Sequence, residues 1–288
     1  ILFETLPNSH KQVLSTQYRM IRNIGNLIST VFYGGTIDTG CKDEDKLHGL
    51  SRYEGNSIIW FDTSENRRRK QKKTKGNSFM NEEEKRIILD ILEDLKKSNE
   101  LDNQDIGIIT GYSGQKDILR NSVKAIGYDK IAQIDINVLD AFQGRENDII
   151  MYSTVRTDNS IGFQKEKERV NVAFSRAKKL LIICGDLNFF YNYNDPNNKF
   201  IEIIKNKGFN EIVVEYTSEV HTIWSDNKLR IIDLHMFKDN CDGTICYEGE
   251  VFQKNIFDGV GKIGNIMVSC INAKNQVLFE AITILYAP

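Results

Sequence analysis

The sequence predicts an α/β protein whose parallel sheet is flanked by helices. Apolar runs of strand length, rich in Ile and Val, occupy residues 106–110, 134–139, 149–155 and 180–184. Such runs are typical of strands that are buried on both faces of a sheet. Segments with helical periodicity, such as residues 116–125, lie between them, and strands that alternate with helices indicate a parallel sheet.

Further helices are expected on either side of these runs. Apolar residues recur at helical spacing from Ile21 to Val31, and the glycine pair that begins at Gly34 would end this helix. Asn81 is suited to cap a second helix, with Glu84 at its third position in a capping box. After residue 186, Asp195 and a following proline predict another helix start.

Two polar clusters, residues 140–146 and 169–178, lie between the last three apolar runs. Open α/β sheets bind ligands at the ends of their strands. The second cluster is expected to be helical, with Arg169 and Arg176 off its buried face. A cation fixed at a strand end is what a transferring phosphoryl group requires. The expected buried face consists of Val170, Val172, Ala173 and Ala177.

Two other polar segments allow alternative interpretations. Gln17, Tyr18 and Arg19 form either a polar helix entrance or a site where the ring stacks on a base and the arginine meets phosphate. Residues 67–75 are densely basic and contain no apolar residue. They are expected to form a solvated, mobile insertion, and a contact with nucleic acid or another anion is the alternative.

Composition limits the remaining possibilities. The chain has 288 residues, 40% of them hydrophobic, and a net charge of −2, so any surface for nucleic acid has to be local. No apolar run is long enough for a membrane span, and the N-terminal residues do not resemble a signal peptide. The five cysteines contain no CxxC pair, which favours reduced thiols in the cytoplasm and no metal site.

The chain is expected to contain two domains. Residues 1–217 would form the α/β domain. From about residue 220, short apolar runs alternate with Gly, Asn and Asp turns, so residues 218–288 are expected to form a small β-rich appendage.

Four blocks, in this order and spacing, resemble the second RecA-like motor domain of superfamily 1 helicases, over roughly residues 1–217. The most similar branch is that of the nonsense-mediated-decay helicase and its bacterial AAA-domain relatives. The blocks are residues 17–20 with 32–35, residues 110–115, residues 140–146 and residues 169–178.

The resemblance implies a role for each matching position. Tyr18, next to Gln17, would stack on the adenine of ATP. Arg19 and Arg176 would reach the terminal phosphate, with Arg176 as the arginine finger. Glu146 would lie near the ribose and phosphates, and Gln143 would link nucleotide state to the grip on nucleic acid. The implied contacts with single-stranded DNA or RNA are Thr110, Tyr112, Gln115 and Asp140.

The sequence departs from the family pattern in several places. Val138 and Gly111 replace the usual hydroxyl residue and proline of the nucleic-acid blocks. No phosphate-binding loop of the type G-x-x-x-x-G-K-[ST] is present. The chain is therefore expected to be the C-terminal half of a motor, with the Mg²⁺ ligands on a first RecA-like domain and negligible ATP hydrolysis by itself. The alternative is a non-catalytic RecA-like module that binds nucleic acid or protein.

Overall fold

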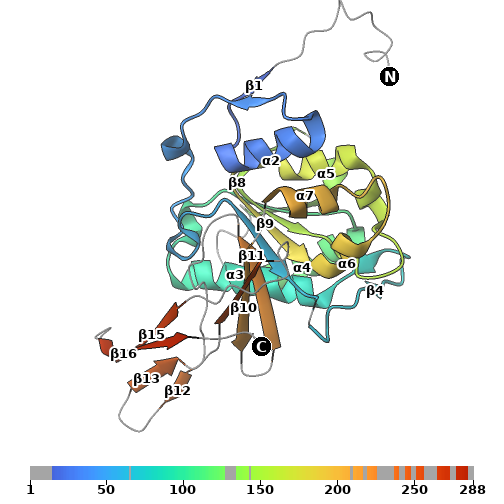
Figure 1. The fold of residues 1–288 in the computed structure, drawn as a ribbon. Helices are drawn as coiled ribbons and strands as arrows, with labels where there is room; N and C mark the ends of the chain where they lie inside the picture. The colour runs from blue at the N-terminus through green and yellow to red at the C-terminus, as the bar shows by residue number, and fades with distance from the viewer. Residues whose placement is uncertain are drawn as a thin grey trace, which may run out of the picture.

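Five parallel strands form the centre of the protein. Four of them are predicted from the sequence, and the strand at residues 58–62 is missed. The computed structural model describes residues 15–64, 66–126, 134–142 and 144–207, and the strands between residues 210 and 284. The order across the sheet is β3, β9, β8, β6, β7. Their bounds are Ile58–Asp62 for β3, Ala177–Gly185 for β9, Asn147–Ser153 for β8, Ile106–Thr110 for β6 and Asp135–Val138 for β7. Figure 1 shows the labelled strands β8 and β9 between two layers of helices.

Helices cover both faces of this sheet. One face packs against α2 (Arg22–Tyr33), α5 (Lys167–Phe174), α6 (Leu187–Asn192) and α7 (Lys199–Lys207). The other packs against α3 (Glu82–Lys97) and α4 (Ser113–Ala125). Successive residues of β9 enter opposite cores, since Leu181 lies in the first and Ile182 in the second. No helix of the described part is long and apolar enough to cross a membrane.

Helix boundaries are only partly those expected. Asn81 caps α3 by accepting hydrogen bonds from the amides of Glu83 and Glu84, and Gly34, at φ 61°, ends α2. In contrast, α5 ends at Phe174, because Ala177 already pairs with Asn147 in the sheet. The expected helix over residues 169–178 is therefore wrong at its C-terminal end.

The helix start expected at Asp195 is also wrong. The side chain of Asp195 accepts a hydrogen bond from the amide of Asn197 at 2.9 Å, which closes a turn. Asn198 then accepts a hydrogen bond from the amide of Phe200 at 3.2 Å, within the first turn of α7. A second capping residue thus lies closer to the helix and sets its start.

The basic segment at residues 67–75 contains a short strand. This strand, β4 (Lys72–Lys73), pairs antiparallel with β5 (Phe79–Met80). The expected mobility of the segment stays a prediction. A second small pair, β1 (Thr16–Gln17) with β2 (Asp38–Thr39), is parallel.

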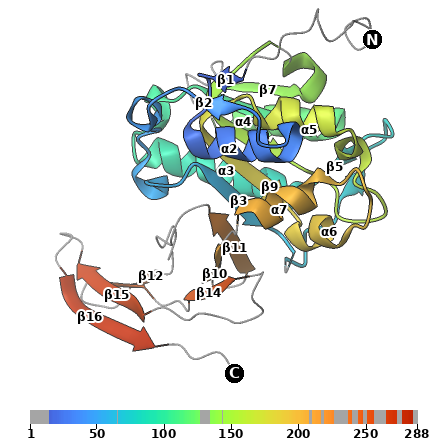
Figure 2. The same ribbon diagram turned by 45° about the horizontal axis from the view of Figure 1, so that its top comes forward.

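The chain after residue 209 contributes strands to two sheets. β10 (Asn210–Tyr216) pairs with β11 (Glu219–Ser225) and β14 (Val251–Asn255), and β11 pairs antiparallel with β3. The division expected after residue 217 therefore lies between two paired strands of one sheet, and it stays a prediction. A four-stranded antiparallel sheet follows (Figure 2), made of β12 (Phe237–Asp239), β13 (Thr244–Tyr247), β15 (Asn265–Asn272) and β16 (Val277–Ile284).

Candidate functional site

The candidate site lies at the edge of the sheet where β8 and β9 begin. Glu146 directly precedes β8, and Arg176 directly precedes β9. The loop that carries Arg19 reaches the same edge, because the amide of Ile21 donates to the carbonyl of Lys178 at 2.8 Å. Ligands of open α/β sheets usually bind at the opposite, carboxyl edge. Glu146 and Arg176 therefore lie at strand ends, as expected for the polar clusters, but these are the amino ends of the strands and not the carboxyl ends.

Arg19, Glu146 and Arg176 are held together by short polar contacts. Arg19 Nε donates to Glu146 Oε2 at 2.6 Å, and Arg19 Nη1 donates to the carbonyl of Ser175 at 3.4 Å. Arg176 Nε donates to the carbonyl of Val172 at 3.1 Å, and its Nη1 donates to the carbonyl of Arg145 at 3.2 Å. Three separate segments of the chain thus place two guanidinium groups beside one carboxylate.

The charge of this cluster is unbalanced. Partial burial and the neighbouring Arg19 lower the pKa of Arg176, and Glu146 acts in the opposite direction. Arginine stays protonated in proteins, so both guanidinium groups remain charged. The side chains of Arg19 and Glu146 are 40% and 45% exposed, which leaves the cluster accessible to an anion.

Gln17 and Tyr18 complete this edge in different ways. The Gln17 side chain shapes the turn: its oxygen accepts from the amides of Arg19 and Met20, and its nitrogen donates to Thr39 Oγ1 at 2.8 Å. Tyr18 is 67% exposed and its ring lies against Gly40. A Cβ on Gly40 would be 2.4 Å from Cε1 of Tyr18, so the ring occupies space that only glycine leaves open.

The positions predicted to contact nucleic acid lie elsewhere. Thr110 and Gln115 are fully buried at the carboxyl end of β6, and Tyr112 is 4% exposed. Gln115 Nε2 donates to Ser153 Oγ at 3.0 Å, so this side chain supports the turn from inside. Asp140 is exposed. Gln143 lies outside the described residues.

Glu84 has a role that its sequence position does not reveal. Its carboxylate is fully buried and accepts hydrogen bonds from Ser153 Oγ at 2.6 Å and from the amide of Val155 at 2.9 Å. Burial raises the pKa of Glu84 to about 8. The expected capping box is wrong, because Gln115 Oε1, rather than Glu84, accepts from the amide of Asn81 at 2.7 Å.

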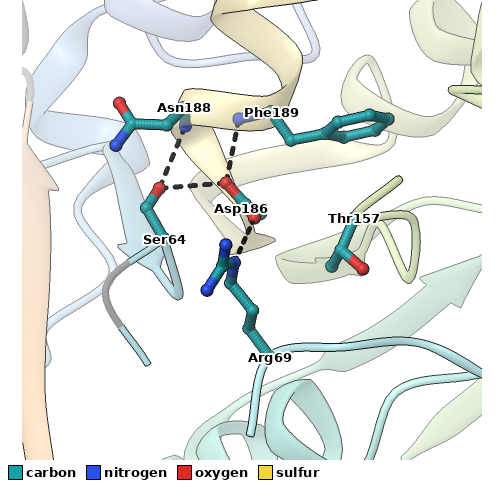
Figure 3. Close-up of a pocket in the computed structure, with 6 residues that line it drawn as sticks. All are labelled: Ser64, Arg69, Thr157, Asp186, Asn188 and Phe189. Carbon is teal, nitrogen blue, oxygen red and sulfur yellow. Dashed lines mark hydrogen bonds and ion pairs between the residues drawn. The ribbon is translucent and has the colours of Figure 1, made fainter. Parts of the chain in front are cut away.

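A polar pocket of about 430 Å³ lies beyond the carboxyl ends of β3 and β9 (Figure 3). Asp186 accepts from the amide of Phe189 at 2.8 Å and pairs with Arg69 Nε at 2.8 Å. Burial raises the pKa of the adjoining Asp62 to about 6. Sequence reasoning missed this site, since its parts are far apart in the chain. The lining residues are Ser64, Arg69, Thr157, Asp186, Asn188 and Phe189.

Within the described ranges, no group of three or more His, Cys, Asp or Glu residues could hold a metal ion. Cys184 and Cys41 are free thiols there, and burial raises the pKa of the Cys184 thiol.

The parallel sheet with helices on both faces, and the arginine–carboxylate cluster at one edge, define a RecA-like α/β domain. A family model described as "AAA domain" matches residues 1–188, and the chain belongs to this family. The matches below confirm the resemblance to superfamily 1 helicases of the nonsense-mediated-decay branch, so the chain contains a helicase-family domain.

Three curated relatives illustrate the similarity. The putative regulator of nonsense transcripts 1 of Takifugu rubripes is 32% identical over 180 residues, covering 60% of this chain and 16% of the relative. The helicase SEN1 of Saccharomyces cerevisiae is 33% identical over 192 residues, covering 62% and 8%. An uncharacterized ATP-dependent helicase of Methanocaldococcus jannaschii is 34% identical over 201 residues, covering 65% and 29%.

The matches therefore span less than a third of each of these relatives. Among solved structures, the C-terminal domain of a possible DNA helicase from Lactobacillus plantarum has a TM-score of 0.36 at 12% identity, covering 63% of this chain and 92% of that one.

Proposed function

We propose that the chain is the second RecA-like motor domain of an ATP-dependent nucleic-acid helicase or translocase. The observation that carries the proposal is the convergence of Arg19, Glu146 and Arg176 at one sheet edge from three separate segments. The partner in this proposal is a first RecA-like domain that carries the phosphate-binding loop and the Mg²⁺ ligands. Residues 218–288 are proposed to be a small β-rich region that follows the motor domain.

The cluster suits the terminal phosphate of ATP. Phosphoryl transfer is accelerated mainly by positioning and by neutralising charge on the transferring group. Two guanidinium groups beside one carboxylate leave excess positive charge for an anion, and each offers a planar fork of N–H donors to phosphate oxygens. Mg²⁺, when bound, neutralises further charge on the β- and γ-phosphates.

The remaining residues of the cluster have supporting roles in this proposal. The exposed Tyr18 ring stacks on adenine, and Gln17 keeps the Tyr18–Arg19 turn in shape. Glu146 holds Arg19 at 2.6 Å until nucleotide arrives. Gln143, five residues after the end of β7, links the nucleotide to the strand-binding surface.

That surface, in the proposal, lies on the turn at residues 110–115 and at Asp140, and it binds single-stranded DNA or RNA. Because Thr110, Tyr112 and Gln115 are buried, they act by shaping the turn, whose backbone and exposed Ser113 meet the strand. The protein is proposed to act in the cytoplasm.

Substitution of the proposed arginine finger tests this function. In the full-length protein, we expect Arg176→Ala to lower the ATP turnover that nucleic acid stimulates by about 10³- to 10⁵-fold. The affinity for a fluorescent ATP analogue would change little, because the contact is made mainly in the transition state.

Arg22→Ala is the matched control. Arg22, the first residue of α2, follows Arg19 by three positions but pairs with Asp43 at 3.4 Å, so its removal should leave turnover unchanged. Near-normal turnover of Arg176→Ala, with an unchanged circular dichroism spectrum, would remove the arginine-finger role.

A further inference from the structure

The basic hairpin, defined as residues 67–80, concentrates positive charge in a chain whose net charge is −2. It contains seven Lys and Arg residues and no acidic residue. Arg69 pairs with Asp186. Five exposed members form no ion pair with any residue that the structure describes: Arg67, Lys70, Lys72, Lys73 and Lys75.

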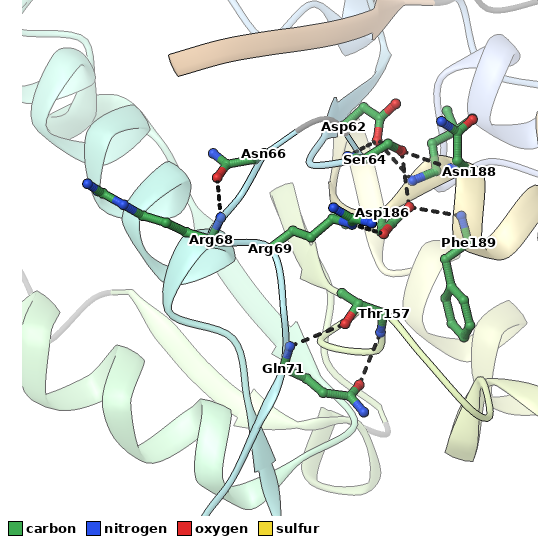
Figure 4. A network of polar contacts seen from close by, with 12 residues as sticks. Asp62, Ser64, Asn66, Arg68, Arg69, Gln71, Thr157, Asp186, Asn188 and Phe189 are labelled. Carbon is green, nitrogen blue, oxygen red and sulfur yellow. Dashed lines mark hydrogen bonds and ion pairs between the residues drawn. The ribbon is translucent and has the colours of Figure 1, made fainter. Parts of the chain in front are cut away.

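Contacts of the backbone and of neutral side chains hold this hairpin in place (Figure 4). The side chain of Asn81 donates to the carbonyl of Arg69 at 2.8 Å. The backbone amide of Gln71 donates to Thr157 Oγ1 at 3.2 Å, and the backbone amide of Thr157 donates to Gln71 Oε1 at 3.0 Å. The lysines take no part in these contacts, so a hydrogen-bonded backbone presents them to solvent. Such preorganisation lowers the entropic cost of binding.

The hairpin packs directly on the turn at residues 110–115. The amide of Gly114 donates to Ser78 Oγ at 3.0 Å, and a Cβ on Gly114 would lie 2.6 Å from Thr74 Cγ2. The rings of Phe79 and Tyr112 are in edge contact, with centroids 5.7 Å apart. The basic side chains of the hairpin therefore adjoin the surface that is proposed to contact the nucleic-acid strand. This surface is at the carboxyl edge of the sheet, opposite the edge that carries Arg19, Glu146 and Arg176.

We infer that the basic hairpin is a second nucleic-acid contact, whose lysines bind phosphates of the single strand that passes residues 110–115. This inference rests on the proposed function. A row of exposed lysines that form no ion pair with any described residue suits a phosphate backbone, which is contacted mainly through charge and independently of sequence. An acidic protein segment is the competing partner, but the adjacency to the turn favours the strand.

The test measures the salt dependence of strand binding in the full-length protein. Labelled 20-nucleotide oligo-dT and oligo-U are titrated, with fluorescence anisotropy as the readout, from 50 to 300 mM KCl. For Lys72→Gln/Lys73→Gln/Lys75→Gln, the negative slope of log Kobs against log salt should become shallower by about 2, since each single-strand phosphate contact contributes about −0.7. Affinity at 0.1 M salt should fall by roughly ten- to a hundredfold on the same basis.

Two further variants separate charge from folding. The matched control, Lys96→Gln/Lys97→Gln/Lys124→Gln, removes three exposed lysines from the ends of α3 and α4 and should keep the slope of the wild type. Lys72→Arg/Lys73→Arg/Lys75→Arg keeps the charge and should keep the affinity. Loss of binding in this variant would show that the lysines act through folding, and would overturn the inference.

The outcomes also separate this inference from the proposed function. If the wild type binds the strand and the Lys72/Lys73/Lys75 variant binds equally well, the hairpin inference fails while the motor function stands. If the wild type binds neither oligonucleotide, the nucleic-acid part of the proposed function fails first, and the inference with it. Tighter binding of a 20-residue poly-Glu peptide than of either oligonucleotide, lost in the same variant, would assign the hairpin to an acidic protein instead.

Discussion

The two edges of the central sheet use ionisable residues in opposite ways. At the amino edge, Arg19 and Glu146 form an ion pair with 40% and 45% of the side chains exposed. At the carboxyl edge, Glu84 is completely buried and Asp186 is 3% exposed. The first arrangement is available to a ligand, whereas the second is satisfied by donors from the same chain.

This difference follows from what each edge has to join. The loops that follow β3, β8 and β9 all begin at the carboxyl edge. Buried carboxyl groups accept hydrogen bonds from the backbone amides just after these strands. Val155, a β-branched residue, has a φ of 68° there, a conformation that is strained for such a residue. The hydrogen bond from its amide to Glu84 holds this backbone in place. A buried carboxylate beside a strand end therefore does not by itself indicate catalysis.

The sequence predicts the strands and the amino-edge residues better than it predicts the carboxyl edge. β6 has the predicted bounds, and the segments with Arg19, Glu146 and Arg176 meet at one edge. The roles of these residues stay predictions. The resemblance identifies short sequence blocks that contain these residues. Parallel pairing of β8 with β9 brings the starts of both strands, and so two of the blocks, to the same edge.

The contacts of Glu84 could not be predicted, because its partners are distant in the sequence: Ser153 follows it by 69 residues. A capping box is a local pattern, and here tertiary contacts override it. The contacts of the basic hairpin could not be predicted for the same reason: its composition identifies a solvated basic segment, but its hydrogen-bond partners Asn81 and Thr157 lie elsewhere in the chain.

The largest effect is expected at the amino edge. In the full-length protein, Arg19→Ala should lower ATP turnover by about 10³-fold, because a phosphate-neutralising cation is lost. Stability should change by less than about 1 kcal/mol, since the pair with Glu146 is exposed. Steady-state ATPase assays and urea denaturation measure the two quantities. A large loss of stability with unchanged turnover would reverse the contrast between the edges.

An intermediate effect is expected at the carboxyl edge, on stability and its pH dependence. The pKa of Glu84 is raised from 4.5 to about 8 in the folded protein. The folded state therefore binds more protons than the unfolded state between these values, and its stability should fall as pH rises through this window. In Glu84→Gln, which cannot ionise, this part of the decline should be absent, a difference on the order of a few kcal/mol at pH 8.

Urea denaturation from pH 5 to 8.5 measures the difference between wild type and variant. Glu93→Gln, on the exposed side of the same helix, is the control and should retain the wild-type slope. Identical slopes for Glu84→Gln and the wild type would mean that Glu84 does not bind the extra proton.

The smallest effect is expected at Gly40, and it tests whether the exposed ring of Tyr18 is a nucleotide contact. A methyl group at this position would lie 2.4 Å from the ring, so Gly40→Ala must displace Tyr18, an exposed side chain that is free to move. Stacking of an aromatic ring on a base contributes about 1–3 kcal/mol. We therefore expect Tyr18→Ala to weaken binding of the ATP analogue by roughly tenfold. Gly40→Ala should weaken it by about threefold, since a displaced ring keeps part of the contact.

Gly76→Ala is the control, because the nearest atom to its added Cβ, Thr74 Oγ1, is 4.0 Å away. If Tyr18→Ala weakens binding but Gly40→Ala does not, the ring stacks in another position than the one seen against Gly40. If neither changes affinity, Tyr18 is an ordinary exposed residue at the entrance of α2.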